Sequence, residues 1–142
     1  FEQKLLLIGL TYRLCGIYSR KLVNRRDSVG HKDETFIRLI GLIEQNFRSQ
    51  RGVEFYADKL CLSPKYLSNL SKSVSGYTVQ ELVFKAIVRE AISLLKNTQK
   101  TVLEISEELN FPNASYFGTF FRKQTGMSPM QMRRNNQMTS PK

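Results

Sequence analysis

The sequence predicts an all-α protein, and three observations support this prediction. Apolar residues recur at intervals of three and four along every long segment, which is the spacing of one helix face. No segment of useful length alternates apolar and polar residues, as a half-buried strand would. A block that opens with helix start signals and closes with glycine occurs twice, about 50 positions apart.

Charge narrows the class of protein further. The chain has 142 residues and a formal net charge of +10. Such an excess of positive charge indicates a polyanionic partner, either a nucleic acid or an acidic membrane surface. Cys15 and Cys61 lie far apart in apolar-periodic stretches, so we expect reduced thiols in the core or at an interface.

The first predicted element is a helix over residues 3–23, followed by a flexible linker over residues 24–32. The helix carries an apolar stripe at 3-4-3 spacing, which needs a partner surface on a missing domain or a second copy. Residues 24–32 are polar and aperiodic. A membrane-surface role for residues 1–23 is an alternative. The candidate dimer or domain contacts are Leu7, Leu10, Leu14 and Ile17.

Two helices are predicted next, over residues 33–49 and 53–60. Asp33 opens the first of them, and Gly52 breaks the chain after it. Their inward-facing residues are predicted to be Phe36, Leu39, Ile40, Ile43, Phe47, Phe55, Tyr56 and Leu60.

The first copy of the repeat then places a helix over residues 64–75. Ser63 is a preferred N-cap residue, and Pro64 is favoured at the first helical position. Gly76 ends the helix, because glycine readily adopts the left-handed conformation that follows many helices. The apolar anchors of this helix are predicted to be Leu67, Leu70 and Val74.

The longest predicted helix, over residues 79–96 with Thr78 as its cap, joins the two copies. Its inward-facing residues are predicted to be Leu82, Val83, Ile87, Ala91, Leu94 and Leu95.

The second copy repeats the pattern of short helix, turn and second helix. Thr101 starts the short helix, Asn113 caps the next one, and Gly126 follows its end. The apolar anchors of this second helix are predicted to be Phe117, Phe120 and Phe121.

A last short helix is predicted from Ser128-Pro129 to about Arg134, and the tail over residues 135–142 is predicted to be disordered. The expected domain division is a terminal helix and linker at 1–32, a helical domain at 33–134 and the tail.

Each copy has the form of a helix-turn-helix, which places its second helix in the major groove of DNA. Asparagine can bind adenine at two atoms, lysine reaches guanine acceptors, and serine or threonine serves several base edges. The predicted base-reading residues lie between the apolar anchors: Lys65, Ser68 and Asn69 in the first copy, and Ala114, Ser115, Gly118 and Thr119 in the second.

Other positive or helix-capping residues are better placed for phosphates than for bases. Side chains further along the second helices can reach the backbone, and helix N-termini can donate N–H groups to phosphate oxygens. The predicted phosphate contacts are Ser63, Lys72, Thr101, Asn113, Arg122 and Lys123. Because the second copy has few long polar side chains, we expect it to discriminate bases less than the first.

The joining helix has a length that suits this interpretation. At ~1.5 Å per residue, roughly 18 residues span about 27 Å. Successive major-groove windows on one face of B-DNA lie ~34 Å apart. One stiff helix could therefore hold two recognition helices near the spacing of adjacent grooves.

These residues resemble the DNA-binding domain of the AraC/XylS family of bacterial transcription regulators over roughly residues 35–134. The specific strings are Ser63-Pro64-Lys65-Tyr66-Leu67-Ser68, Ile105 to Phe111, Ser115-Tyr116-Phe117, Phe120 to Pro129, and Arg133. Departures from the family pattern are Asn69 and Ser71, where arginine and phenylalanine are frequent, the small residues Gly118 and Thr119, and Met132 in place of an aromatic.

The resemblance implies a domain of about seven helices with two helix-turn-helix units joined by a long helix. It also implies two adjacent major-groove segments read by the base-facing residues given above. A sensing or dimerising domain usually precedes this domain in the family, so residues 1–23 resemble its last helix.

The resulting hypothesis is a sequence-specific regulator of transcription that binds double-stranded DNA. We expect an activator that contacts RNA polymerase, a homodimer formed through residues 1–23, no membrane partner, and a cytoplasmic location at the nucleoid. The alternative is a helical protein–protein adapter, which needs neither a net charge of +10 nor a repeated capped helix.

An enzyme is not expected. His31 stands alone in the predicted linker, so we predict no metal site and no cofactor. The sequence has no nucleophile elbow and no phosphate-binding glycine loop.

Overall fold

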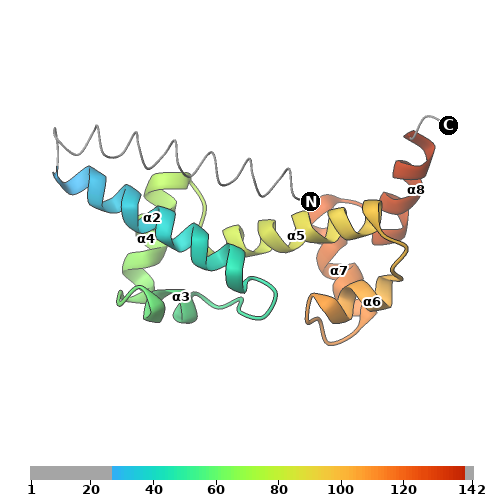
Figure 1. Cartoon of the computed structure of the whole chain (residues 1–142), viewed down its shortest axis with the longest axis horizontal. Coiled ribbons are helices and arrows are strands. Elements are labelled where there is room, and N and C mark those ends of the chain that lie inside the picture. The colour runs from blue at the N-terminus through green and yellow to red at the C-terminus, as the bar shows by residue number, and fades with distance from the viewer. Residues whose placement is uncertain (1–26, 140–142) are drawn as a thin grey trace. The chain divides into compact units, whose positions relative to one another are not determined.

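The computed structural model describes residues 27–139, which form seven helices and no strand (Figure 1). The predicted helix over 3–23, with its stripe, lies outside these residues, as does Cys15. The helices are α2 (Asp27–Asn46), α3 (Val53–Lys59), α4 (Pro64–Ser75), α5 (Val79–Asn97), α6 (Val102–Glu108), α7 (Ala114–Thr125) and α8 (Pro129–Thr139).

The boundaries of α2 differ from the prediction at both ends. The helix begins at Asp27 rather than Asp33, so most of the predicted linker is helical, and it ends at Asn46 rather than Ser49. The Thr35 hydroxyl donates to the His31 carbonyl at 2.8 Å, four residues earlier, as in a regular helix. Polar, aperiodic sequence is typical of exposed helices as well as linkers, which is why the prediction was wrong here.

Helix α8 is also longer than predicted. It continues past Arg134 to Thr139, so residues 135–139 of the predicted disordered tail are helical. No glycine or proline interrupts the chain between Pro129 and Pro141. This absence of helix-breaking residues explains why the helix continues past Arg134.

The chain divides into two compact units. Unit 1 contains α2 as far as Gln45, then Gly52–Val79 with α3 and α4. Unit 2 contains residues 46–51 and everything from Gln80 onward, including α6, α7 and α8.

The core of unit 1 is formed by aliphatic residues and one tyrosine. Leu67 and Leu70 of α4 are buried as predicted, but Val74 is 38% exposed and is not an anchor. Ser71 is fully buried in its place, and its hydroxyl donates to the Tyr77 carbonyl at 2.8 Å. Ser71 lies one helical turn after Leu67 and therefore faces the same core. The hydrogen bond of its hydroxyl lowers the free-energy cost of burying it. Tyr56 of α3 is also buried, and this raises its pKa to about 12.

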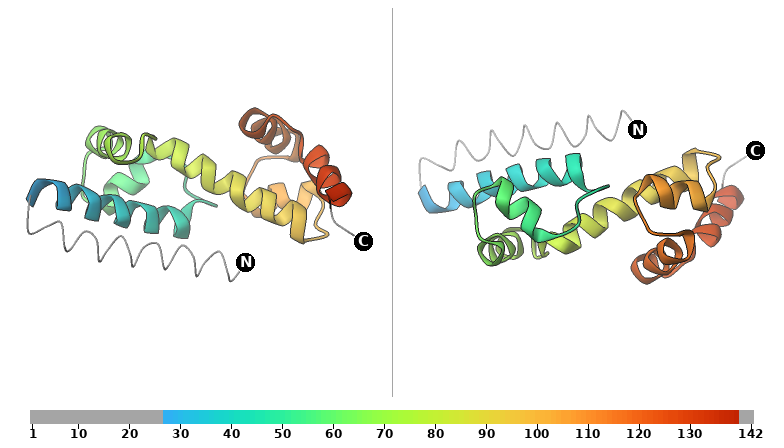
Figure 2. Two further views of the ribbon diagram at one scale, coloured as in Figure 1. Left: turned by 90° about the horizontal axis from the view of Figure 1, so that it is seen from above. Right: turned by 90° about the horizontal axis from the view of Figure 1, so that it is seen from below.

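The core of unit 2 combines aliphatic residues of α5 and α6 with a cluster of phenylalanines. Phe117 and Phe121 of α7 are fully buried. The ring of Phe120 is half-buried and lies edge-on to Phe84 of α5, with centroids 5.1 Å apart. In Figure 2, α6, α7 and α8 gather around the C-terminal part of α5. Arg133 of α8 fixes this arrangement by donating from Nε to the Leu95 carbonyl at 3.1 Å.

Two further findings concern the described residues only. None of their helices is long and apolar enough to cross a membrane. They also contain no group of three or more His, Cys, Asp or Glu side chains that could hold a metal ion.

Candidate nucleic-acid interface

Helix α4 has the ends that its sequence predicts. The Ser63 hydroxyl accepts a hydrogen bond from the Tyr66 amide at 3.2 Å, so it is the N-cap. Gly76 has φ of 81°, and its amide donates to the Lys72 carbonyl at 2.9 Å, which closes the helix. These caps fix where α4 begins and ends, and therefore which residues share its outer face.

The predicted base-reading residues of α4 lie together on that outer face. Lys65 and Asn69 are exposed and Ser68 is half-buried, while Lys72, predicted to contact phosphate, is exposed one turn further on. Their spacing of three and four residues places them on one side of the helix. All four side chains are polar, so this face presents hydrogen-bonding groups to solvent.

Helix α7 is built in the same way. The Asn113 side-chain oxygen accepts from the Tyr116 amide at 2.7 Å. Gly126, with φ of 82°, closes the helix by donating to the Arg122 carbonyl at 2.8 Å. The two second helices are therefore equivalent from cap to cap.

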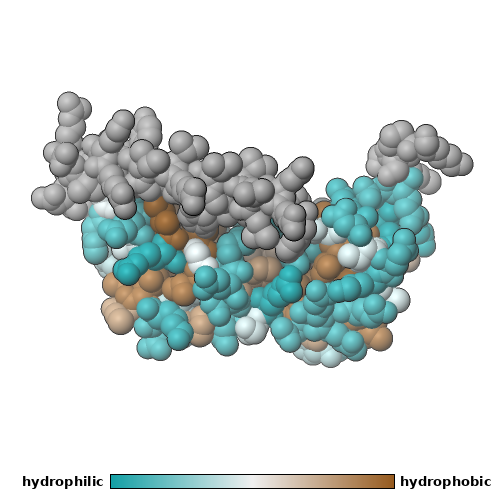
Figure 3. All heavy atoms as spheres, in the orientation of Figure 1, coloured by the Kyte–Doolittle hydropathy of each residue, from teal (hydrophilic) through white to brown (hydrophobic). Residues whose placement is uncertain are grey.

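The outer face of α7 carries smaller groups than that of α4. Ser115 and Thr119 are exposed, and Ala114 and Gly118 are half-buried. The Thr119 hydroxyl donates to the Ser115 carbonyl at 3.0 Å, which commits its hydrogen to its own helix. Arg122 and Lys123, predicted to contact phosphate, are exposed at the far end of the same helix. Figure 3 shows mainly hydrophilic residues on the visible surface of unit 2.

The side chains of the three predicted phosphate-binding caps already accept hydrogen bonds from their own helices. Thr101 is the N-cap of α6, and its hydroxyl accepts from the Glu104 amide at 3.1 Å, just as Ser63 and Asn113 accept from theirs. All three caps are exposed. Any phosphate contact at these helix ends would therefore use the remaining first-turn N–H groups rather than the cap oxygens.

The turns between the paired helices share one backbone conformation. Cys61 and Asn110 follow their short helices with φ of 56° and 59°, the left-handed region. The closing hydrogen bonds also match, from Leu62 to the Ala57 carbonyl and from Phe111 to the Ser106 carbonyl, both at 2.9 Å. Cys61 is a free thiol that is exposed in this turn, so it is not a core residue, and its place at an interface stays a prediction.

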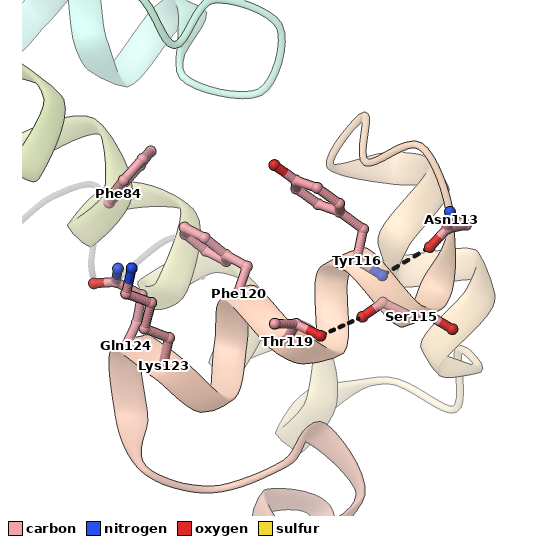
Figure 4. Close-up of a pocket in the computed structure, with 8 residues that line it drawn as sticks. All are labelled: Phe84, Asn113, Ser115, Tyr116, Thr119, Phe120, Lys123 and Gln124. Atoms are coloured by element: carbon pink, nitrogen blue, oxygen red, sulfur yellow. Dashed lines mark hydrogen bonds between the residues drawn. The ribbon is translucent and has the colours of Figure 1, made fainter.

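A pocket of about 560 Å³ runs along α7 in unit 2 (Figure 4). Phe84, Tyr116 and Phe120 supply most of its aromatic wall, and Thr119 borders it on the outer face of the helix. The remaining lining residues are Asn113, Ser115, Lys123 and Gln124. Four of the predicted DNA-contacting residues of unit 2 thus line this apolar hollow: Asn113, Ser115, Thr119 and Lys123.

Sequence reasoning missed two exposed tyrosines. Tyr66 is 44% exposed and Tyr116 is 60% exposed, each at the third position of its helix. The repeat aligned them with each other, since Tyr66-Leu67 matches Tyr116-Phe117, but no role was drawn from the match. Two large, exposed aromatic rings therefore adjoin the predicted DNA-contacting faces.

Sequence reasoning also missed the segment Asn46–Arg51, called here the 46–51 segment. It lies between α2 and α3 in the chain but belongs to unit 2. Arg48 forms an ion pair with Glu90. The backbone carbonyl of Arg48 accepts a hydrogen bond from the Asn110 side chain at 2.8 Å. Arg51 donates to the Leu109 carbonyl. A possible signal was the pair of arginines between the end of the apolar face and Gly52.

Comparisons with known proteins identify the family. A family model described as a helix-turn-helix domain matches residues 56–135. The transcriptional activator RhaS of Mannheimia succiniciproducens is 31% identical over 104 residues, which cover 73% of this chain and 39% of RhaS. The bifunctional transcriptional activator and DNA repair enzyme AdaA of Bacillus subtilis is 31% identical over 96 residues, covering 68% of this chain and 46% of AdaA. The chain thus spans less than half of these relatives.

Solved structures agree with this result. The C-terminal domain of AraT, a response regulator from Geobacillus stearothermophilus, is 33% identical with a TM-score of 0.67, covering 71% of this chain and 84% of that one. The DNA-binding domain of AdpA in complex with target DNA has a TM-score of 0.68 at 20% identity, covering 75% and 96%, and shows the fold alone. The chain belongs to the AraC/XylS family of transcription regulators, and its helix-turn-helix region is an AraC-type DNA-binding domain.

Proposed function

We propose that this domain reads two successive major-groove segments of one duplex, with α4 and α7 as its recognition helices. The supporting observation is the equivalence of the two helices. Each has a side-chain N-cap, a left-handed closing glycine and exposed polar residues at helical spacing. Helix α5, 19 residues long, separates α4 from the pair α6 and α7 in the sequence. At ~1.5 Å per residue it is about 28 Å long, close to the ~34 Å between grooves.

In unit 1, Lys65, Ser68 and Asn69 are the proposed base-reading residues. An asparagine amide can bind the N6 and N7 edge of adenine at two points, and a lysine ammonium can reach guanine O6 or N7. Lys65 and Asn69 are exposed on the outer face of α4, so both side chains can extend into a groove.

In unit 2, Ala114, Ser115, Gly118 and Thr119 would contribute shape more than hydrogen bonds. A helix-interior glycine costs about 1 kcal/mol relative to alanine. A Cβ at Gly118 would meet nothing within 4 Å, so packing inside the protein does not require the glycine. Close approach of DNA to α7 would explain the presence of Gly118. Contact between the Ala114 methyl group and a thymine methyl group would likewise explain Ala114.

Phosphate contacts would surround both recognition helices. Lys72, Arg122 and Lys123 are exposed at the ends of α4 and α7. The first-turn amides after Ser63, Thr101 and Asn113 would add hydrogen bonds directed at phosphate oxygens.

The role of the whole protein is part of the same proposal. RhaS and AdaA are named transcriptional activators. We extend activation, contact with RNA polymerase and a cytoplasmic location at the nucleoid to this protein on that likeness. Its relatives' names also favour a regulator over an enzyme, although AdaA carries both names. A homodimer through residues 1–23 and a sensor domain ending before residue 33 are further parts of the proposal, and α2 runs continuously across residue 33.

The experiment measures binding to a duplex selected from a random pool and to an unrelated duplex across a salt series. We expect the selected duplex to bind on the order of 1,000-fold more tightly, and log affinity to fall linearly with log salt for both. A flat salt plot, or equal affinity for the two duplexes, would contradict the proposal and favour an adapter.

A further inference from the structure

We propose that the 46–51 segment positions the recognition helix of unit 2, with Arg51 as its central residue. The proposal rests on the DNA-reading function proposed above and adds a determinant outside both helix-turn-helix units. Arg51 would not touch a base. It would set the orientation in which α7 presents Ser115, Gly118 and Thr119 to the groove.

The first step is the hold of Arg51 on the turn between α6 and α7. Its guanidinium donates to the carbonyl of Leu109, the residue that ends α6. The same planar group lies over the ring of Phe111, 4.1 Å from the centroid. The planar shape of arginine allows both contacts at once, which the ammonium of lysine cannot reproduce.

The second step leads from Phe111 to α7. The Phe111 ring lies 5.1 Å from Phe117 and 5.2 Å from Phe120, measured between centroids. It also lies 6.3 Å from Tyr116. These three residues belong to the first two turns of α7, which also carry the proposed base-reading residues. A shift of Phe111 would therefore move the reading face itself.

The third step is the anchoring of the segment. Arg48 pairs with Glu90 of α5, and another of its nitrogens lies 3.7 Å from Glu108 at the end of α6. Lys100 reaches the same carboxylate at 2.5 Å. Glu90 is only 13% exposed, so the pair holds a definite geometry even though half-exposed ion pairs add little stability.

The alternative role for Arg51 is a direct phosphate contact. Its placement argues against this, because the residue is half-buried and its guanidinium is directed at a carbonyl and a ring. Burial lowers the pKa of Arg51, and the neighbouring Tyr116 opposes this effect. An arginine intended for phosphate would be exposed, as Arg122 is.

The test compares Arg51→Lys and Arg51→Met with Arg38→Met, which removes one charge from an exposed residue of α2. Binding of the 142-residue chain is measured on the selected duplex and on duplexes substituted in either segment. Asn69→Ala identifies the segment read by unit 1. We expect both Arg51 variants to lose at least fivefold of the base discrimination in the DNA segment read by unit 2. Discrimination in the segment read by unit 1 and the slope of log affinity against log salt should stay unchanged.

Three results would overturn the inference. One is wild-type base discrimination in Arg51→Lys together with a slope of log affinity against log salt that is about 0.9 smaller for Arg51→Met. That combination is the signature of one lost phosphate contact. Another is a loss in Arg51→Met that equals the loss in Arg38→Met. The third is an equal loss across both segments. If circular dichroism shows that Arg51→Met is unfolded, Arg51→Lys and Phe111→Leu carry the same comparison. A wild-type chain without any duplex preference would instead remove the proposed function.

Discussion

Units 1 and 2 share one backbone plan but distribute their large side chains in opposite ways. Position 71 of α4 is a buried serine, and the matching position 121 of α7 is a buried phenylalanine. On the outer faces the contrast is opposite. Ser68 and Asn69 of α4 correspond to Gly118 and Thr119 of α7, which offer fewer hydrogen-bonding groups. Helix α4 is therefore small on its buried side and rich in hydrogen-bonding groups on its outer side, whereas α7 is bulky on its buried side and has fewer such groups outside. The difference suggests hydrogen-bonded base reading by α4 and shape-dependent contact by a firmly packed α7.

The largest expected effect tests the two cores at matched, fully buried positions. Phe117→Ala should lower the free energy of unfolding by about 3–5 kcal/mol, and Leu67→Ala by about 2–5 kcal/mol. The phenylalanine should be the costlier loss because its ring contacts Phe111 and Phe121, with centroids 5.1 and 5.8 Å away. Urea unfolding followed by circular dichroism measures both variants. A larger loss for Leu67→Ala would show that the aromatic cluster adds no extra stability.

The next effect concerns base discrimination at matched outer positions. Asn69→Ala should cost about 1–3 kcal/mol at one base pair and relax the preference there. Thr119→Ala should cost less, because the Thr119 hydroxyl already donates to the Ser115 carbonyl at 3.0 Å. Binding assays on all four single-base variants of each position measure the two losses. A uniform loss on every sequence would reassign Asn69 to the DNA backbone.

Gly118 separates folding from binding within unit 2. Gly118→Ala should raise the free energy of unfolding by about 1 kcal/mol, since the site is helical and open. The same variant should weaken binding to the selected duplex if DNA approaches α7 closely. Gly41→Ala is the control, because it adds the same methyl group at an open helical glycine of α2, outside both recognition helices. Unchanged affinity for Gly118→Ala would leave the glycine without a role in DNA contact.

The smallest expected effect lies in the first turn. Cys61 adopts φ of 56°, where asparagine is better tolerated than other residues with a side chain. Cys61→Asn should therefore stabilise the domain by up to about 1 kcal/mol, the scale of backbone substitutions of this kind. The reverse change, Asn110→Cys, should destabilise it and also removes the hydrogen bond to the Arg48 carbonyl. Thermal unfolding decides between these signs, and destabilisation by Cys61→Asn would refute the backbone explanation.

Local signals were sufficient to predict most of the fold. Ser63, Thr101 and Asn113 are the N-caps that their sequence contexts indicated, and Gly76 and Gly126 close the recognition helices. Periodicity also predicted the buried Leu67, Leu70, Phe117 and Phe121. These features depend on residues within a few positions of one another, so a single sequence contains the information.

Other features depend on contacts that leave no local pattern. Arg51 meets a carbonyl 58 residues away, and the Asn110 side chain bonds to Arg48 across 62 residues. Ser71 was not among the predicted anchors, because its hydrogen-bond partner is a backbone carbonyl, which has no sequence signature. The start of α2 was missed for a different reason, since an exposed polar helix and a linker have similar composition.

The most direct test of two recognition helices acting on one duplex is methylation interference on the selected site, with the target bases methylated at guanine N7 in the major groove. The account predicts two clusters of interference about 10 base pairs apart on one face of the duplex, as two successive major-groove contacts require. Lys65→Ala, which removes a side chain that can reach guanine N7, should abolish interference in one cluster only. A single cluster, or two clusters on opposite faces, would contradict the account.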